Sequence, residues 1–192
     1  LSVTGGHIIE SGNSRSLPGY LVTLDPVGVP FTGQRLQLYG AYGDYWTIDQ
    51  RYVKGALVHR MRAGLAWHIT PKFRFDLSLD HYALWGGESP KYGKMKVDLG
   101  NYLRVITGRP AGDDGTRSDK LNVIGDHGGG ECFRVTFEET AWSAVFQHDI
   151  PYSDGSGMGF QNFPDGVNTL SFSLKDKEHW ISDIVLEHQY TR

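Results

Sequence analysis

The sequence predicts an all-β fold of antiparallel strands, of the kind that forms a transmembrane β-barrel. Three observations favour this fold class: apolar and polar residues alternate over many segments, short turns are interspersed with long polar loops, and aromatic residues lie near the ends of several segments. Strict alternation places apolar side chains on one face of a strand and polar side chains on the other.

The clearest alternation lies at residues 72–80, where Phe73, Phe75, Leu77 and Leu79 are separated by polar residues. A helix would scatter these four side chains around its circumference. No segment shows a convincing helical stripe. The expected strands cover residues 20–25, 35–42, 53–68, 72–80, 133–138, 142–147, 170–174 and 180–190.

Turns of two lengths connect these strands. Residues 70–72 and 139–140 are short enough to form hairpin turns, whereas residues 86–92, 108–120 and 151–167 are long and rich in Gly, Asp, Ser and Pro. Short turns on one side and long loops on the other are typical of outer-membrane barrels. A soluble β-sandwich remains the alternative.

The aromatic residues Trp180 and Tyr190 fall on one face of the last expected strand. Ten residues of tilted strand rise roughly 25 Å, which is the height of the apolar band of a membrane barrel. In such a barrel the opposite face points into the lumen, where water and opposite charges satisfy polar groups. The expected lumen residues include Arg60, Arg62, Arg74, Asp76, Asp80 and Asp183.

Composition narrows the possible functions. The chain has 192 residues and a net charge of -3, so it lacks the basic field that nucleic-acid binding requires. Its longest apolar run, residues 82–85, is far shorter than the roughly 20 residues of a membrane-spanning helix. The single cysteine, Cys132, is expected to be a packed side chain. Because the chain begins with Leu1 and ends in a strand-like pattern, we expect a fragment of a longer protein.

Three stretches carry a resemblance to a known family. They are Trp85-Gly86-Gly87, the segment 122–127 with the sequence Asn-Val-Ile-Gly-Asp-His, and Asp154-Gly-Ser-Gly followed by Phe163-Pro-Asp-Gly. In their order and spacing they resemble the capsule assembly Wzi family of Gram-negative outer-membrane proteins. Pro18-Gly19, His59 and Glu187 also suit that pattern, so the resemblance extends over most of the chain.

The resemblance implies a barrel of about 18 strands in the bacterial outer membrane, of which residues 1–192 form a partial barrel domain with about eight or more strands. It also implies a lectin-like protein that binds capsular polysaccharide or exopolysaccharide and is not an enzyme. Outer-membrane lipids and accessory outer-membrane proteins are the other implied partners. The chain departs from the family in its Gly-rich segment 126–130, expected to be a turn, in Cys132, expected to open the next strand, and in the lack of a helical bundle.

Trp85 and the polar residues near it are the first candidate polysaccharide contacts. An indole beside Gly86 and Gly87 offers a face on which a sugar ring stacks, although a Trp at the membrane interface has the same sequence appearance. Asn122, Asp126 and His127 form a polar cluster at the expected entrance of a strand. Their side chains suit sugar hydroxyls, but Asn and Asp also stabilise turns.

The loop at residues 151–167 supplies Asp154, Ser156 and Asp165 as further candidates. Turn formation is the default role of these residues, because the loop lacks the ligand run of a calcium site. Ser156 lies in no nucleophile elbow, and the carboxylate pairs 113–114 and 138–139 are sequence neighbours rather than a facing catalytic pair. The histidines have no ligand-like spacing. We therefore expect no catalytic residue, no metal and no cofactor.

Two other functions fit the same pattern. A passive porin would use the polar strand faces to line a diffusion channel. A soluble β-sandwich would form a carbohydrate-binding module and would remain monomeric without detergent.

Overall fold

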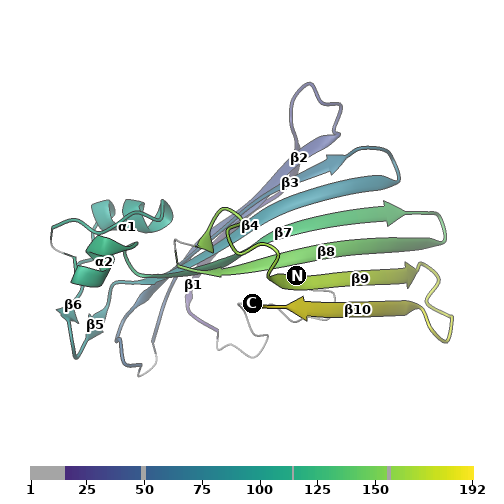
Figure 1. Ribbon diagram of the computed structural model, residues 1–192. Coiled ribbons are helices and arrows are strands. Elements are labelled where there is room, and N and C mark those ends of the chain that lie inside the picture. Colours follow the sequence, from purple (N-terminus) through teal and green to yellow (C-terminus); the bar gives the residue numbers. More distant parts are fainter. Residues whose placement is uncertain (1–15, 49–50, 114, 155–156) are drawn as a thin grey trace.

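The computed structural model describes residues 16–48, 51–113, 115–154 and 157–192, and shows one large antiparallel sheet (Figure 1). Every strand of this eight-stranded sheet pairs with its neighbour in the chain, and β1 and β10 form the two edges. The all-β prediction is confirmed at this level. The strands are β1 (Gly19–Gly28), β2 (Leu36–Trp46), β3 (Leu57–His68), β4 (Phe73–Trp85), β7 (Asp126–Glu138), β8 (Trp142–Ser153), β9 (Gly166–Leu174) and β10 (Asp183–Tyr190).

The register gives the sheet two chemically different faces, because directly paired residues point to the same side. Phe73 pairs with Phe137 and Leu77 with both Leu65 and Phe133, and we call their side the apolar face. The opposite side is the polar face. The prediction that six charged residues share one face is confirmed, because the register places Arg60, Arg62, Arg74, Asp76, Asp80 and Asp183 together on the polar face.

Residues 86–125, between β4 and β7, form an insertion that projects beyond one end of the sheet, opposite the β3–β4, β7–β8 and β9–β10 hairpin turns (Figure 1). The expected loops 86–92 and 108–120 are both parts of it. The insertion contains the two-stranded hairpin β5 (Glu88–Ser89) and β6 (Gly93–Lys94) and the helices α1 (Leu99–Ile106) and α2 (Arg117–Leu121).

The expectation of no helix was therefore wrong, and the reason is length. α1 has only eight residues, so its apolar pattern covers about two turns. The Asp98 side chain caps α1 by accepting a hydrogen bond from the Asn101 N–H at 2.7 Å. Val105 packs inward with Ala83, Trp85 and Ile124. Neither helix in the described part of the chain is long and apolar enough to cross a membrane.

Most strand boundaries differ from those predicted, and three of the differences change a predicted feature. β8 continues to Ser153, so the expected loop 151–167 is shorter. β10 begins at Asp183, which leaves the exposed Trp180 outside the strand and separates it from Tyr190. β7 begins at Asp126, so the Gly-rich segment 126–130 is strand and not the expected turn, and Cys132 lies within the strand.

Gly129 explains how a glycine-rich segment continues as strand. The Tyr152 hydroxyl passes over Gly129 and donates a hydrogen bond to the Asp80 carbonyl oxygen at 3.0 Å. A Cβ at position 129 would lie 2.1 Å from that carbonyl oxygen and 2.2 Å from the Tyr152 hydroxyl oxygen. The glycine is therefore needed for close packing and not for a turn.

We predict that Gly129→Ala destabilises the protein by about 1–3 kcal/mol, because the added methyl group collides with backbone and with Tyr152. Denaturant unfolding of the purified protein measures this change. Gly100→Ala, in α1, is the matched control, because its Cβ would meet only the Asp98 side chain, at 3.3 Å. Equal stability of wild type and Gly129→Ala would contradict the packing role.

Candidate functional site

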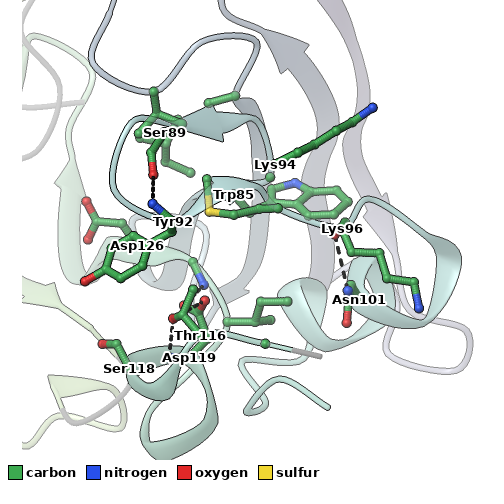
Figure 2. Close-up of a pocket in the computed structure, with 18 of the residues that line it drawn as sticks. Trp85, Ser89, Tyr92, Lys94, Lys96, Asn101, Thr116, Ser118, Asp119 and Asp126 are labelled. Atoms are coloured by element: carbon green, nitrogen blue, oxygen red, sulfur yellow. Dashed lines mark hydrogen bonds between the residues drawn. The ribbon is translucent and has the colours of Figure 1, made fainter. Parts of the chain in front are cut away.

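A pocket of about 490 Å³ opens between the insertion and the end of the sheet (Figure 2). The β5–β6 hairpin, α1 and α2 surround it, and the last residues of β4 and the first residue of β7 complete the wall. We call this the rim pocket. Because most of its wall comes from the insertion, its shape depends on how the insertion is held on the sheet.

Apolar and aromatic side chains form much of the rim pocket. Trp85 contributes its indole, and Tyr52 and Tyr92, which are both exposed, contribute two more rings. Aromatic rings offer faces on which the C–H surface of a sugar stacks. The remaining apolar lining residues are Val53, Ala56, Leu84, Met95 and Ile124.

Polar side chains of two kinds complete the wall. Thr116 and Asp119 hold the local structure: the Thr116 hydroxyl donates to the Asp119 carboxylate at 2.7 Å, and the Gly125 N–H donates to the same carboxylate at 3.2 Å. The side chains of Lys94 and Asp126, in contrast, make no hydrogen bond or ion pair within the described residues. These two side chains are available to a ligand.

The predicted contact Trp85 lines the rim pocket but is not an exposed platform. Only 5% of its surface is accessible, and its ring stacks on Tyr102 with centroids 5.7 Å apart. The alternative of an exposed interfacial Trp is equally inconsistent with this burial. Trp85 therefore belongs to the small core under α1 and presents only part of its ring to the pocket.

The expected cluster of Asn122, Asp126 and His127 is divided by the strand. Asp126 lines the rim pocket, whereas His127, the next residue, points to the apolar face and is 2% exposed. The cluster was expected at the entrance of a strand, but β7 already begins at Asp126, and successive residues of a strand point to opposite faces. Asn122 is exposed at the C-terminal end of α2, outside the pocket lining.

The loop candidates lie elsewhere. The Asp154 N–H donates to the His127 carbonyl oxygen at 2.8 Å, and Asp165 accepts a hydrogen bond from the Arg192 N–H at 3.2 Å. Ser156 and the pair 113–114 cannot be compared with the structure, because residues 114, 155 and 156 lie outside the described residues. Glu138 and Glu139 pair with different lysines, Lys175 and Lys72.

Sequence reasoning missed a second group of polar residues. Five polar side chains lie on the apolar face between the middle of the sheet and the insertion, and all are almost fully buried. We call them the polar patch: His59, His81, His127, Glu131 and His148. Their spacing in sequence is irregular, but the strand register would have placed them on one face. Among the described residues, no three His, Cys, Asp or Glu side chains are arranged to hold a metal ion.

Tyr102 on α1 connects the insertion to the sheet. Its hydroxyl donates to the Asp44 carboxylate at 2.6 Å, and the same carboxylate accepts from Tyr20 at 2.5 Å and bonds His59 at 2.9 Å. Burial, and then the bond to Asp44, raise the pKa of Tyr102 far above its ordinary value. The phenol therefore stays protonated and remains a donor. This bond fixes α1 and thereby one wall of the rim pocket.

Comparisons with protein-family models, with curated proteins and with solved structures found no match to this chain. The two sheet faces and the rim pocket are the features of the described residues that bear on function.

We predict that Tyr102→Phe lowers the free energy of unfolding by about 1.5–3 kcal/mol, because it removes a hydrogen bond to a charged carboxylate. The tyrosine of the unfolded chain ionises near pH 10, whereas Tyr102 stays protonated in the folded protein. The difference between wild type and variant is therefore complete below pH 10 and decreases as the pH rises above it. Denaturant unfolding at several pH values measures both effects.

The matched control is Tyr45→Phe, next to Asp44 in β2. The Tyr45 hydroxyl makes no hydrogen bond to another described residue. It should leave stability nearly unchanged. A Tyr102→Phe variant as stable as this control would contradict the anchoring role of the hydroxyl.

Proposed function

We propose that this chain forms part of the wall of a bacterial outer-membrane β-barrel that binds surface polysaccharide, of the capsule assembly Wzi type. In this proposal the polar face lines the lumen and the apolar face contacts lipid. The eight strands are a portion of the roughly 18 that such a barrel contains. The rim pocket lies at the end of the wall where polysaccharide is bound.

The observation that carries the proposal is an inverted pattern of burial. On the apolar face, large side chains are open to the surroundings: Leu170 is 51% and Leu186 63% exposed. Soluble monomers rarely expose a wide apolar surface of this kind. A barrel in a membrane does so by construction, because its outer band faces hydrocarbon.

The polar face supports the same arrangement through its ion pairs. Arg62 donates two hydrogen bonds to Asp80, both at 2.8 Å, and Asp80 is only 5% exposed. Arg74 pairs with Asp76, and Arg134 bonds Gln147 at 2.8 Å. Charged groups on a lumen face pair with one another and with water, and they do not contact lipid.

The rim pocket supports polysaccharide as the ligand. Sugars are bound by aromatic faces together with polar groups that bond adjacent hydroxyls. Tyr52 and Tyr92 provide the former, together with the part of the Trp85 ring that reaches the pocket, and Lys94 and Asp126 provide the latter. One cation and one anion leave the free polar groups without net charge, which suits a polyhydroxylated ligand better than a strongly charged one.

A passive porin is the second candidate, and the charged polar face favours it, since porin lumens are polar. Conductance of the reconstituted protein in planar bilayers separates the two functions. A polysaccharide-binding barrel occluded by its loops should conduct little. Large, steady conductance without polysaccharide retention would favour the porin.

We predict that Asp126→Asn weakens polysaccharide binding about 10- to 100-fold, because it replaces a charged acceptor of sugar hydroxyls by a neutral group. The measurement is binding of a panel of purified capsular polysaccharides to the reconstituted protein. Asp176→Asn is the matched control, because Asp176 is exposed in the β9–β10 connection, at the hairpin end of the sheet away from the insertion.

In cells, deletion of the gene should reduce surface polysaccharide, and the wild-type gene should restore it whereas the Asp126→Asn gene restores less. Unchanged polysaccharide on the surface after deletion would overturn the proposed function.

A further inference from the structure

The apolar face is not apolar along its whole height. On β3 and β4 its side chains are aliphatic or aromatic from the hairpin turn to Leu79. The polar patch begins with His148, opposite Phe133, and continues with Glu131, opposite Leu79, and with His81. Ionisable groups that face lipid directly are costly. A membrane wall with this face outward therefore requires the polar patch to be covered.

The polar patch satisfies much of its hydrogen-bonding capacity within the protein. His81 Nε2 and His127 Nδ1 are 2.8 Å apart, and His127 Nε2 bonds the Ile124 carbonyl oxygen at 2.9 Å. His148 Nδ1 bonds the Asn168 side chain at 3.0 Å. All five members are less than 8% exposed, so side chains from outside the sheet must cover them.

The first cover is α1. Tyr102 lies edge-on to the His59 ring with centroids 5.7 Å apart, and its hydroxyl reaches Asp44 on the same face. Val105 packs on Ala83 and Trp85, which also belong to this face. α1 is therefore fixed on the apolar side of the sheet.

The second cover is the segment 157–165 between β8 and β9. The Glu131 carboxylate accepts hydrogen bonds from the Gly159 N–H at 2.7 Å and from the Phe160 N–H at 2.8 Å. The Phe160 ring lies 5.0 Å from the Phe133 ring, and the Phe163 ring meets His148 edge-on at 5.6 Å. This segment covers the part of the polar patch that α1 does not reach.

Large apolar side chains are exposed on both covers. On α1, Leu99 is 72% exposed and Leu103, one turn later, 53%. In the second cover, Phe163 is 62% exposed and Phe160 is also accessible. A cover that faced water would carry polar residues at these positions. Instead, the covers continue the exposed apolar surface of the sheet beyond the polar patch.

We propose that α1 and the segment 157–165 are lipid-contacting covers, which shield the polar patch and extend the apolar band of the wall to the membrane interface. The inference rests on the proposed function, because it takes the apolar face to be the lipid side. The partner is the acyl-chain and headgroup boundary of the membrane. Continuity between the covers and the exposed apolar face favours lipid over a second protein.

The test uses single cysteines in a Cys132→Ser background of the full-length protein, labelled with bimane and reconstituted in vesicles that contain nitroxide-labelled lipid. Leu103→Cys reports on α1 and Phe163→Cys on the second cover. Leu170→Cys, on the exposed apolar face, tests the proposed membrane wall itself. Lys120→Cys, exposed on α2, is the control on the insertion outside the covers.

Lipid nitroxide should quench labels at positions 103, 163 and 170 at least twofold more than the label at position 120. If the label at position 170 is quenched but the labels at positions 103 and 163 are not, the covers do not contact lipid, and the proposed function still stands. Labels at 103 and 163 that are buried against protein would give this outcome. No quenching at 170 would overturn the proposed wall and the covers together. Because Glu131 holds the segment 157–165 through two hydrogen bonds, Glu131→Ala should reduce the quenching of the label at position 163. Quenching of the label at position 103 should not change.

Discussion

The register in which β4 pairs with β3 and β7 is the constraint on which the rest of the structure depends. Leu77 stands opposite Leu65 and Phe133, and Asp80 stands opposite Arg62. A shift of one residue would move Asp80 to the apolar face and Leu77 among the arginines. Both the charged network of the polar face and the exposed band of the apolar face therefore follow from one register.

The same register makes the insertion and the sheet one functional unit. Asp44 and His59 pair across β2 and β3 on the apolar face, and this pair is where Tyr102 binds. The bond holds α1 over the polar patch on one side and shapes the rim pocket on the other. Polysaccharide binding and lipid contact are thus proposed for two sides of one small helix. Val105 packs α1 on the sheet, and the exposed Leu103 is the side chain proposed to contact lipid.

The sequence predicted a segment within each of the eight strands of the sheet, four of them from period-two alternation, and it predicted the shared face of Arg62, Arg74 and Asp80. Alternation failed where the structure depends on contacts between residues that are distant in the sequence. Gly129 gives no strand signal in the sequence. A glycine is needed there because the Tyr152 ring passes over it from the next strand. α1 is too short for its period to be visible, and its position depends on one tyrosine. Asp126 was found as a candidate, but its separation from His127 required the knowledge that both lie in a strand.

The most direct test of the membrane wall is a spin-label scan of β4 from Phe75 to Asp80 in the reconstituted full-length protein. Lipid-soluble oxygen and a water-soluble nickel chelate report the environment of each label. The account predicts a period of two, with oxygen contact at 75, 77 and 79 and chelate contact at 76, 78 and 80. Chelate contact at all six positions, or at 75, 77 and 79 alone, would contradict it.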